Sequence, residues 1–280
     1  MRSTLRRWLR GPRDAEGRPE PPAVSEAEWE RLAPALLAAG PGLAGATGGS
    51  GTRVVARVMR RGGMFIGEDL NVSEDALDFA AFSDRWINGY WSGNEPPEMR
   101  SELRALVARQ GADRERQDQP WGWKEPRSVY LLPFLERHLP SLRFLHLVRD
   151  GRDMAYSSNQ MQLLKHGAAI LPPADEPQPL RSIALWSTVN LAAADFGEST
   201  LGDRYLRLRF EDLCAEPAAT VAAILRFFEL DGDAELIAAE EVSRPETFGR
   251  WRTEDPSLVA PLTERAAPAL ARFGYQSSSA

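Results

Sequence analysis

An α/β fold with a central parallel sheet flanked by helices is predicted by the order in which apolar patterns follow one another. Residues 142–148 (LRFLHLV) form a continuous apolar run with one histidine, which is typical of a parallel strand buried on both faces. A second run leads into the glycine-rich turn 45–53 (GATGGSGTR), after which apolar residues recur at helical spacing: Val54, Val55, Val58 and Met59. Strands that alternate with helical patterns predict a parallel sheet covered on both sides.

The first elements follow from local signals. Ser25 and Glu28 have the spacing of a capping box and predict a helix that runs to about Ala39. Pro41-Gly42 ends this helix. The short apolar stretch 43–44 that follows is predicted to be the strand before the glycine turn, so the local order is strand, turn, helix.

The later elements repeat this alternation. A helix is expected from about Asp150, after the 142–148 strand. Residues 205–210 alternate aromatic or aliphatic residues with arginines and predict a strand with one exposed face. After Pro217, one helical face is marked by Val221, Ile224, Leu225 and Phe228. In such sheets ligands bind beyond the carboxyl ends of the strands, where the glycine turn and the segment 148–157 both fall.

The bulk properties favour one domain over 23–280, preceded by a flexible basic lead-in at 1–22. The chain has 280 residues, 43% of them hydrophobic, which suffices for a full core. The arginine-rich residues 1–11 form either a short amphipathic helix that touches anionic lipid or a frayed terminus. The proline-rich acidic stretch 172–179 is an exposed loop, and 167–180 is a possible lid over an acceptor.

Charge and composition limit the partners. A formal net charge of −6 argues against general nucleic-acid binding but permits a local basic pocket for a small polyanion. We find no apolar run of membrane-spanning length, so no stable membrane insertion is expected. Cys214 is the single cysteine, which excludes an intrachain disulfide and favours a reducing, cytoplasmic location. The oligomeric state is not predicted.

The glycine turn has the composition of a phosphate cradle. Glycines allow successive backbone N–H groups to point into one concavity, and the next helix adds a partial positive charge. Ser50 and Thr52 add hydroxyl donors. The alternative is that the glycines only let a strand pack closely on a helix. A Walker A loop needs a lysine before its final Ser or Thr, whereas Thr52-Arg53 follow Gly51 here; we therefore expect phosphate binding with no metal required.

The segment 148–157 (VRDGRDMAYS) is the second candidate anion site. If Arg149 lies at the strand end and Ser157 two helical turns later, the two flank a phosphate at the edge of the sheet. Asp150 and Asp153 fall near a helix N-terminus, where acidic side chains are favoured. Ordinary capping with surface ion pairs is the alternative.

Taken together, the two motifs resemble the sulfotransferase family, in the subgroup whose glycine turn reads GG-S-G-T, over roughly 43–251. The resemblance implies a P-loop-like sulfotransferase fold. It also implies transfer of a sulfuryl group from 3′-phosphoadenosine-5′-phosphosulfate (PAPS) to a hydroxyl, with release of 3′-phosphoadenosine-5′-phosphate (PAP). It assigns the 3′-phosphate to Arg149 and Ser157, and the 5′-phosphosulfate to the turn residues Gly48, Gly49, Ser50, Gly51, Thr52 and Arg53.

Further segments resemble parts of the same family. WGWKEPRS (121–128) is similar to the strand that delivers a lysine, here Lys124, to the bridging oxygen of the leaving group. Lys124 is one of two lysines, and a compact ammonium suits a single oxygen better than a guanidinium. YLRLRFEDLCAEP (205–217) resembles another recurrent segment. FGRWR (248–252) resembles the loop that closes over the donor, which makes Arg250 a phosphate contact, while Trp251 either stacks on adenine or is buried.

Two positions depart from the family pattern. Gly49 stands where members usually carry Lys or Arg, so either Arg53 compensates or the site has one cation fewer. Pro126 stands where cytosolic members place a catalytic histidine, so a base must come from elsewhere. We favour Glu68, because members with a glutamate base carry it after the first helix; Asp69 and Asp75 are alternates. The other interpretation is that Glu68 and Asp69 only begin a turn or cap a helix.

The acceptor is the least determined part. Trp86, Tyr90 and Trp91 recur near one helical face and either hold an acceptor or belong to the core. His146 is expected in the core and His138 at a helix end, while His166 borders the lid. Carbohydrate, lipid headgroup, peptide tyrosine and natural-product hydroxyls remain open. Two alternative functions are a P-loop kinase that uses ATP and magnesium, and a sulfotransferase-like binding module without catalysis.

Overall fold

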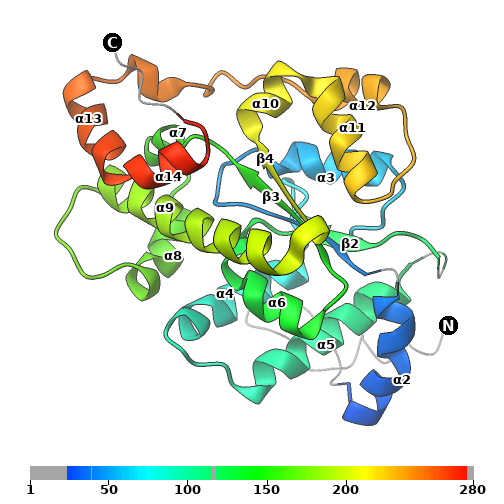
Figure 1. The fold of residues 1–280 in the computed structure, drawn as a ribbon. Helices are drawn as coiled ribbons and strands as arrows, with labels where there is room; N and C mark the ends of the chain where they lie inside the picture. The colour runs from blue at the N-terminus through cyan, green and yellow to red at the C-terminus, as the bar shows by residue number, and fades with distance from the viewer. Residues whose placement is uncertain (1–23, 39, 115, 117, 276–280) are drawn as a thin grey trace.

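The computed structural model describes residues 24–38, 40–114, 116 and 118–275. The predicted lead-in at 1–22 lies outside the described residues. Figure 1 shows a central sheet with helices on both sides. The strands are β1 (Gly42–Gly45), β2 (Gly122–Lys124), β3 (Arg143–Val148) and β4 (Tyr205–Arg209). The α-helices are α2 (Glu26–Leu37), α3 (Thr52–Arg61), α4 (Leu77–Trp91), α5 (Pro97–Ala112), α6 (Leu132–His138), α7 (Gly151–Ala155), α8 (Met161–Ile170), α9 (Gln178–Phe196), α10 (Phe210–Ala215), α11 (Pro217–Phe227), α12 (Ala234–Glu241), α13 (Pro256–Arg265) and α14 (Ala267–Arg272). Shorter helical turns are η1 (Pro126–Leu131), η2 (Gly197–Leu201), η3 (Gly202–Arg204) and η4 (Arg250–Thr253).

The four strands form one parallel sheet in the order β2-β1-β3-β4, which confirms the predicted fold class. Leu43 of β1 pairs with Trp123 of β2 on one side and Phe144 of β3 on the other. Because all strands run the same way, their carboxyl ends share one edge. That edge carries the glycine turn after β1, Lys124 at the end of β2 and Arg149 after β3.

Both faces of the sheet are buried, as the apolar strand pattern predicts. Leu43 and Phe144 pack into a cluster with α4, α5, η1, α6 and α9. The next residues along each strand, Ala44 and Leu145, point to the other face and pack with α3, α11 and α12. The alternation of side chains along the parallel strands thus places one hydrophobic cluster on each face of the sheet.

Local signals set the helix starts. The Ser25 hydroxyl accepts a hydrogen bond from the Glu28 amide at 3.3 Å, which confirms the predicted cap, and the helix ends at Leu37. Strand β4 ends at Arg209, one residue before the predicted limit, because Phe210 begins α10. All five β4 residues are half-buried, so this strand lacks the predicted exposed face.

His146 is a core histidine, as predicted. Its Nδ1 lies 2.6 Å from the Tyr205 hydroxyl and its Nε2 lies 2.8 Å from Oδ1 of Asn190. Burial lowers the pKa of His146 to about 4. The unfolded chain therefore binds a proton between pH 6.5 and 4 that the folded chain does not, and stability falls as pH decreases through this window.

We expect this histidine alone to cost on the order of 3 kcal/mol of unfolding free energy at pH 4 relative to pH 7. Urea unfolding of wild type and His146→Gln at several pH values measures the effect. The variant should lose stability at neutral pH through its altered hydrogen bonds but show a shallower decline with acid. Parallel pH profiles in the two proteins would contradict the assignment.

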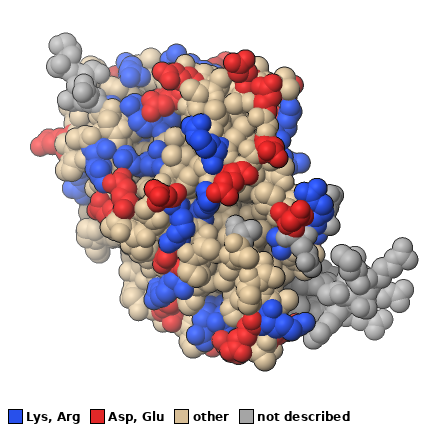
Figure 2. Space-filling view, turned by 45° about the vertical axis from the view of Figure 1, so that its right-hand side comes forward, with Lys and Arg blue, Asp and Glu red and all other residues tan. Residues whose placement is uncertain are grey.

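The surface between these elements is mixed in charge. Figure 2 shows acidic and basic side chains interspersed on the face in view. The irregular part of the possible lid spans 171–177, since 167–170 belong to α8 and 178–180 to α9. Glu176 in this loop pairs with Arg265 of α13 at 3.3 Å. Within the described ranges, no helix is both long and apolar enough to cross a bilayer.

Candidate functional site

The glycine turn between β1 and α3 is shaped by two left-handed glycines. Gly49 has φ +78° and Gly51 has φ +86°, conformations that side chains rarely adopt. A Cβ at Gly51 would lie 2.3 Å from the Phe210 ring, so this position requires glycine sterically as well. The Ser50 hydroxyl donates to the carbonyl of Thr47 at 2.6 Å and braces the turn from inside.

The conformation of Gly49 gives a physical reason for the missing cation. A lysine or arginine would be strained at φ +78°, and its Cβ would lie 3.3 Å from Cε of Met154 and 3.6 Å from Oγ of Ser157. The backbone conformation and the close contact with Met154 therefore favour glycine at this position. Arg53, the second residue of α3, lines the cavity described next, and its Nη2 donates to the Ser73 hydroxyl at 3.0 Å.

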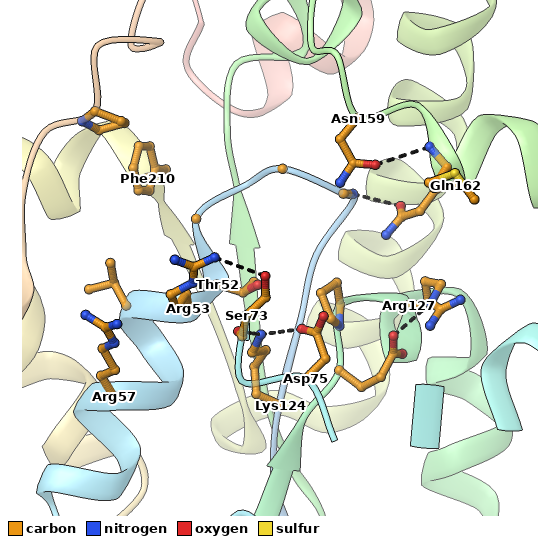
Figure 3. A pocket seen from close by; sticks show the side chains of 18 of the residues that line it. Thr52, Arg53, Arg57, Ser73, Asp75, Lys124, Arg127, Asn159, Gln162 and Phe210 are labelled. Atoms are coloured by element: carbon orange, nitrogen blue, oxygen red, sulfur yellow. Dashed lines mark hydrogen bonds and ion pairs between the residues drawn. The ribbon is translucent and has the colours of Figure 1, made fainter. Parts of the chain in front are cut away.

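A cavity of about 620 Å³ opens at the carboxyl edge of the sheet (Figure 3). Its size falls within the range of small-molecule sites. Figure 3 shows Arg53 and Arg57 of α3 on one side of Lys124, and Arg127, Asn159 and Gln162 on the other. The lining residues are Gly48, Gly49, Gly51, Thr52, Arg53, Val54, Arg57, Ser73, Asp75, Lys124, Glu125, Pro126, Arg127, Asn159, Met161, Gln162, Lys165, Phe210, Glu241, Ser243 and Pro245.

Lys124 lies at the floor of this cavity and is fully buried. Its Nζ donates to the carbonyl of Ser73 at 2.5 Å and pairs with the carboxylate of Asp75. Burial lowers the pKa of Lys124, while the Asp75 charge opposes that shift. A buried ammonium held between two oxygens is a fixed positive charge that can stabilise an anion in the cavity.

A short loop brings Asp75 to the lysine. Oδ1 of Asn71 accepts from the amides of Ser73 and Asp75 at 2.8 and 3.0 Å, and its Nδ2 donates to Oδ2 of Asp75 at 2.9 Å. Leu70 bridges to Ala76 in antiparallel fashion, so the loop turns back on itself. Asp75 is therefore aimed by its own loop as well as by Lys124.

Glu68 and Asp69 occupy a different position from the one we predicted. Both side chains are exposed, and neither lines the cavity that contains Lys124. Gly67, with φ +103°, redirects the chain before them, and the charge of Glu68 acts on Asp113 instead. Of the three candidate carboxylates, the alternate Asp75 is the one that the structure places in the cavity.

Arg149 joins three segments behind the glycine turn. Its Nη1 donates to the carbonyl of Gly49 at 3.3 Å, and its Nη2 donates to Oδ2 of Asp153 at 2.9 Å and to the carbonyl of Thr247 at 2.5 Å. The side chain is only 5% exposed. Its Nε is buried and has no hydrogen-bond partner among the described residues. This donor is therefore left without a hydrogen-bond acceptor in the described part of the chain.

Asp153 ties the segment 247–251 to this arginine. Besides Arg149, its carboxylate accepts from the amides of Gly249 at 2.7 Å and Trp251 at 3.2 Å. Arg250 in turn donates from Nη1 to the carbonyl of Tyr156 at 3.2 Å. The motif 148–157 and the segment 248–252 thus lie together, although about a hundred residues separate them.

Trp251 is buried rather than placed in the glycine-turn cavity. Its ring packs beneath the guanidinium of Arg152, 3.7 Å from the ring centroid, and it lines a second cavity of about 920 Å³ beside α13 and α14. Trp86 and Trp91 are half-buried and donate to Glu102 and to the carbonyl of Tyr130. None of these tryptophans lines the cavity that contains Lys124.

The other two histidines also lie outside that cavity. His166 is buried, with Nδ1 2.8 Å from Oδ1 of Asn88, and is not exposed to an acceptor. His138 is the last residue of α6, as predicted, and burial lowers its pKa.

Several lining residues were not found by sequence reasoning. Arg127 follows the predicted lysine by three positions, and Asn159, Gln162 and Lys165 recur every third residue around the start of α8. That spacing indicates one helical face, but only the packing of α8 against α4 turns this face toward Lys124. Ser73 and Arg57 likewise reach the cavity only because of the way the 70–76 loop and α3 pack, which the sequence pattern does not show.

Comparisons with known proteins agree with this fold. Among solved structures, the chain is similar to sulfotransferase STF9 from Mycobacterium avium (11% identity; 89% of this chain and 81% of that chain covered; TM-score 0.57). It is also similar to the sulfotransferase domain from the curacin biosynthetic pathway (15% identity; 84% and 98% covered; TM-score 0.53). No curated protein matches. The sequence profile described as "Sulfotransferase family" matches residues 36–234, and the chain therefore belongs to the sulfotransferase family.

Proposed function

We propose that this chain transfers a sulfuryl group from PAPS to a hydroxyl of an acceptor and releases PAP. One observation carries the proposal: two separate cationic sites flank the same glycine turn. Arg149 and Arg250 lie behind the turn, and Lys124 with Arg53 lies in the cavity before it. A nucleotide that carries anions at both its 3′ and 5′ positions matches two such sites better than a single phosphate chain does.

The residues present fit such a donor. The left-handed glycines carry no side chains that could cover the turn, although the Gly48 amide already donates to Oε1 of Gln162 at 2.7 Å, and helix α3 begins directly after the turn. The unpartnered Nε of Arg149 needs an acceptor, which a 3′-phosphate would supply. Ser157, beside Gly49, adds a hydroxyl at the same place. Trp251, by contrast, is buried away from the cavity and has no part in the proposal.

Lys124 and Asp75 would carry out the transfer step. The donor, when bound, supplies an activated sulfuryl group whose departure leaves negative charge on a phosphate oxygen. Lys124 would stabilise that charge from the cavity floor. Asp75 would orient the acceptor hydroxyl and take its proton, since it lines the cavity and lies beside the lysine. We place Asp75, rather than Glu68, in this role.

Ligand-induced stabilisation tests the donor assignment. PAP should raise the unfolding free energy by about 2.7 kcal/mol at a concentration 100 times its Kd, because it binds only the folded chain. ATP with magnesium and AMP should stabilise much less at equal concentration. Thermal unfolding with each ligand measures the difference. Equal shifts for PAP and AMP would contradict a 3′-phosphate site, and a larger shift for magnesium-ATP would favour a kinase.

Turnover separates an enzyme from a binding module. We expect sulfate transfer from PAPS in a screen of hydroxyl acceptors, with PAP release as the readout. If the wild-type protein binds PAP but releases no PAP from PAPS with any acceptor, the protein is a binding module rather than an enzyme.

A further inference from the structure

The cavity has a wall that the proposed donor site does not use. Opposite α3 lie Arg127, Asn159 and Gln162 (Figure 3), and Lys165 also lines the cavity; we call these four residues the α8 wall. Gln162 and Lys165 are three residues apart in α8 and so share one helical face. All four side chains carry hydrogen-bond donors. The wall faces Asp75 and Lys124 across the cavity.

Gln162 is held in a defined orientation. Its Oε1 accepts from the Gly48 amide at 2.7 Å and from the Tyr130 hydroxyl at 2.8 Å. Because the carboxamide oxygen accepts from two donors, the positions of the oxygen and nitrogen atoms of the Gln162 side chain are defined. The Nε2 group is then left for the cavity, and in Figure 3 it points toward the cavity interior. Gln162 thus contacts the glycine turn with one atom and offers a donor beside it with the other.

Arg127 and Lys165 are fixed by a shared carboxylate. Asp84 binds Arg127 through Oδ1 and Nζ of Lys165 through Oδ2, the latter at 2.7 Å, and Glu125 accepts from Nε of Arg127 at 2.8 Å. Burial opposes ionisation of Asp84, but the nearby His166 ring, the hydrogen bond from Lys165 and the charge of Arg127 outweigh it and lower the pKa of Asp84 to about 2. Asp84 therefore stays charged and holds both cations in place at neutral pH.

Aromatic rings are missing from this side of the cavity. Phe210 is the one aromatic residue among the described lining residues, and it lies by the donor site, where Arg149 is 5.1 Å from its ring centroid. Trp86, Tyr90 and Trp91 pack elsewhere. A site that presents fixed donors and no aromatic ring on this side favours a ligand rich in oxygen acceptors and rejects one that leaves those donors unpaired.

We propose that the α8 wall is the acceptor subsite and that the acceptor is a hydroxyl-rich, non-aromatic molecule of the sugar or polyol class. This inference rests on the sulfuryl transfer proposed above. The wall binds neighbouring hydroxyls of the acceptor through Gln162, Lys165 and Arg127, and leaves one hydroxyl directed at Asp75. Flat phenols and sterols lack the oxygen atoms that these donors require.

Saturation-transfer NMR on the PAP-loaded protein tests the inference. The probes are glucose, N-acetylglucosamine, maltose and myo-inositol, compared with 4-nitrophenol and 2-naphthol. We expect saturation-transfer signals from members of the first group. Addition of a phenol should not abolish these signals. Lys165→Met should weaken the binding of the responding sugar or polyol about tenfold, as expected for a hydrogen bond to a charged group, with PAP affinity unchanged.

Arg85→Met is the matched control. Arg85 is 44% exposed and pairs with Glu102, against 41% exposure for Lys165, and it lies outside the cavity. It should leave both affinities unchanged. A protein that binds PAP but gives signals only with phenols, or with no sugar or polyol at all, overturns the inference. Equal sugar affinity in wild type and Lys165→Met overturns the role of the wall. Failure to bind PAP overturns the proposed function instead.

Discussion

Lys124→Met is expected to lower kcat for sulfate transfer by about 10²- to 10³-fold, the usual cost of removing one group that stabilises charge in the transition state. Methionine is close in length and apolar, so it fills the buried position without the charge. PAP affinity should change little, because Arg149 and the glycine turn provide the other contacts. Steady-state kinetics with PAPS and a responding acceptor, together with PAP titration, measure the two effects.

Two further variants make this expectation specific. Lys124→Arg keeps a charge but presents a planar fork at a site built for one ammonium, so we expect it to recover only part of the rate. Asp75→Asn should also lower kcat and should flatten the acidic limb of its pH profile if Asp75 takes the proton. Wild-type kcat in Lys124→Met would remove the lysine from the mechanism.

Arg149→Gln is expected to weaken PAP binding by about 10- to 100-fold while changing AMP binding much less, since an interaction with a charged group contributes about 1.5–3 kcal/mol. The difference between the two nucleotides isolates the 3′-phosphate within one variant. Isothermal titration with PAP and AMP measures it. The comparison is internal, so a general loss of affinity from misfolding would weaken both ligands alike.

The Arg149→Gln variant should be compared with a double variant, because the single substitution leaves the Asp153 carboxylate without its cation. Asp153 is 2% exposed, and an unpaired buried carboxylate is destabilising. The double variant Arg149→Gln/Asp153→Asn removes both charges and should restore part of the thermal stability without restoring PAP affinity. If PAP and AMP lose affinity equally in both proteins, Arg149 does not contact the 3′-phosphate.

The sequence by itself determined the fold and the placement of the anion-binding motifs. Strand β3, the glycine turn and helix α3 follow from short-range patterns, and parallel strands must end on one edge. Arg149 could therefore be placed at that edge from its position after the apolar run 142–148, whereas Lys124 was placed by the resemblance of residues 121–128 to a family strand. The same local logic applies to His146, whose place inside an apolar strand predicted its burial.

Only the tertiary structure decided which carboxylate and which wall complete the cavity. The resemblance, which places a glutamate base after the first helix, favoured Glu68, but that residue is exposed outside the cavity. Hydrogen bonds with Asn71 instead fold the loop so that Asp75 meets Lys124. The residues of the α8 wall likewise come from a helix whose facing side depends on its packing against α4. Such contacts join residues far apart in the chain, and no short-range pattern records them.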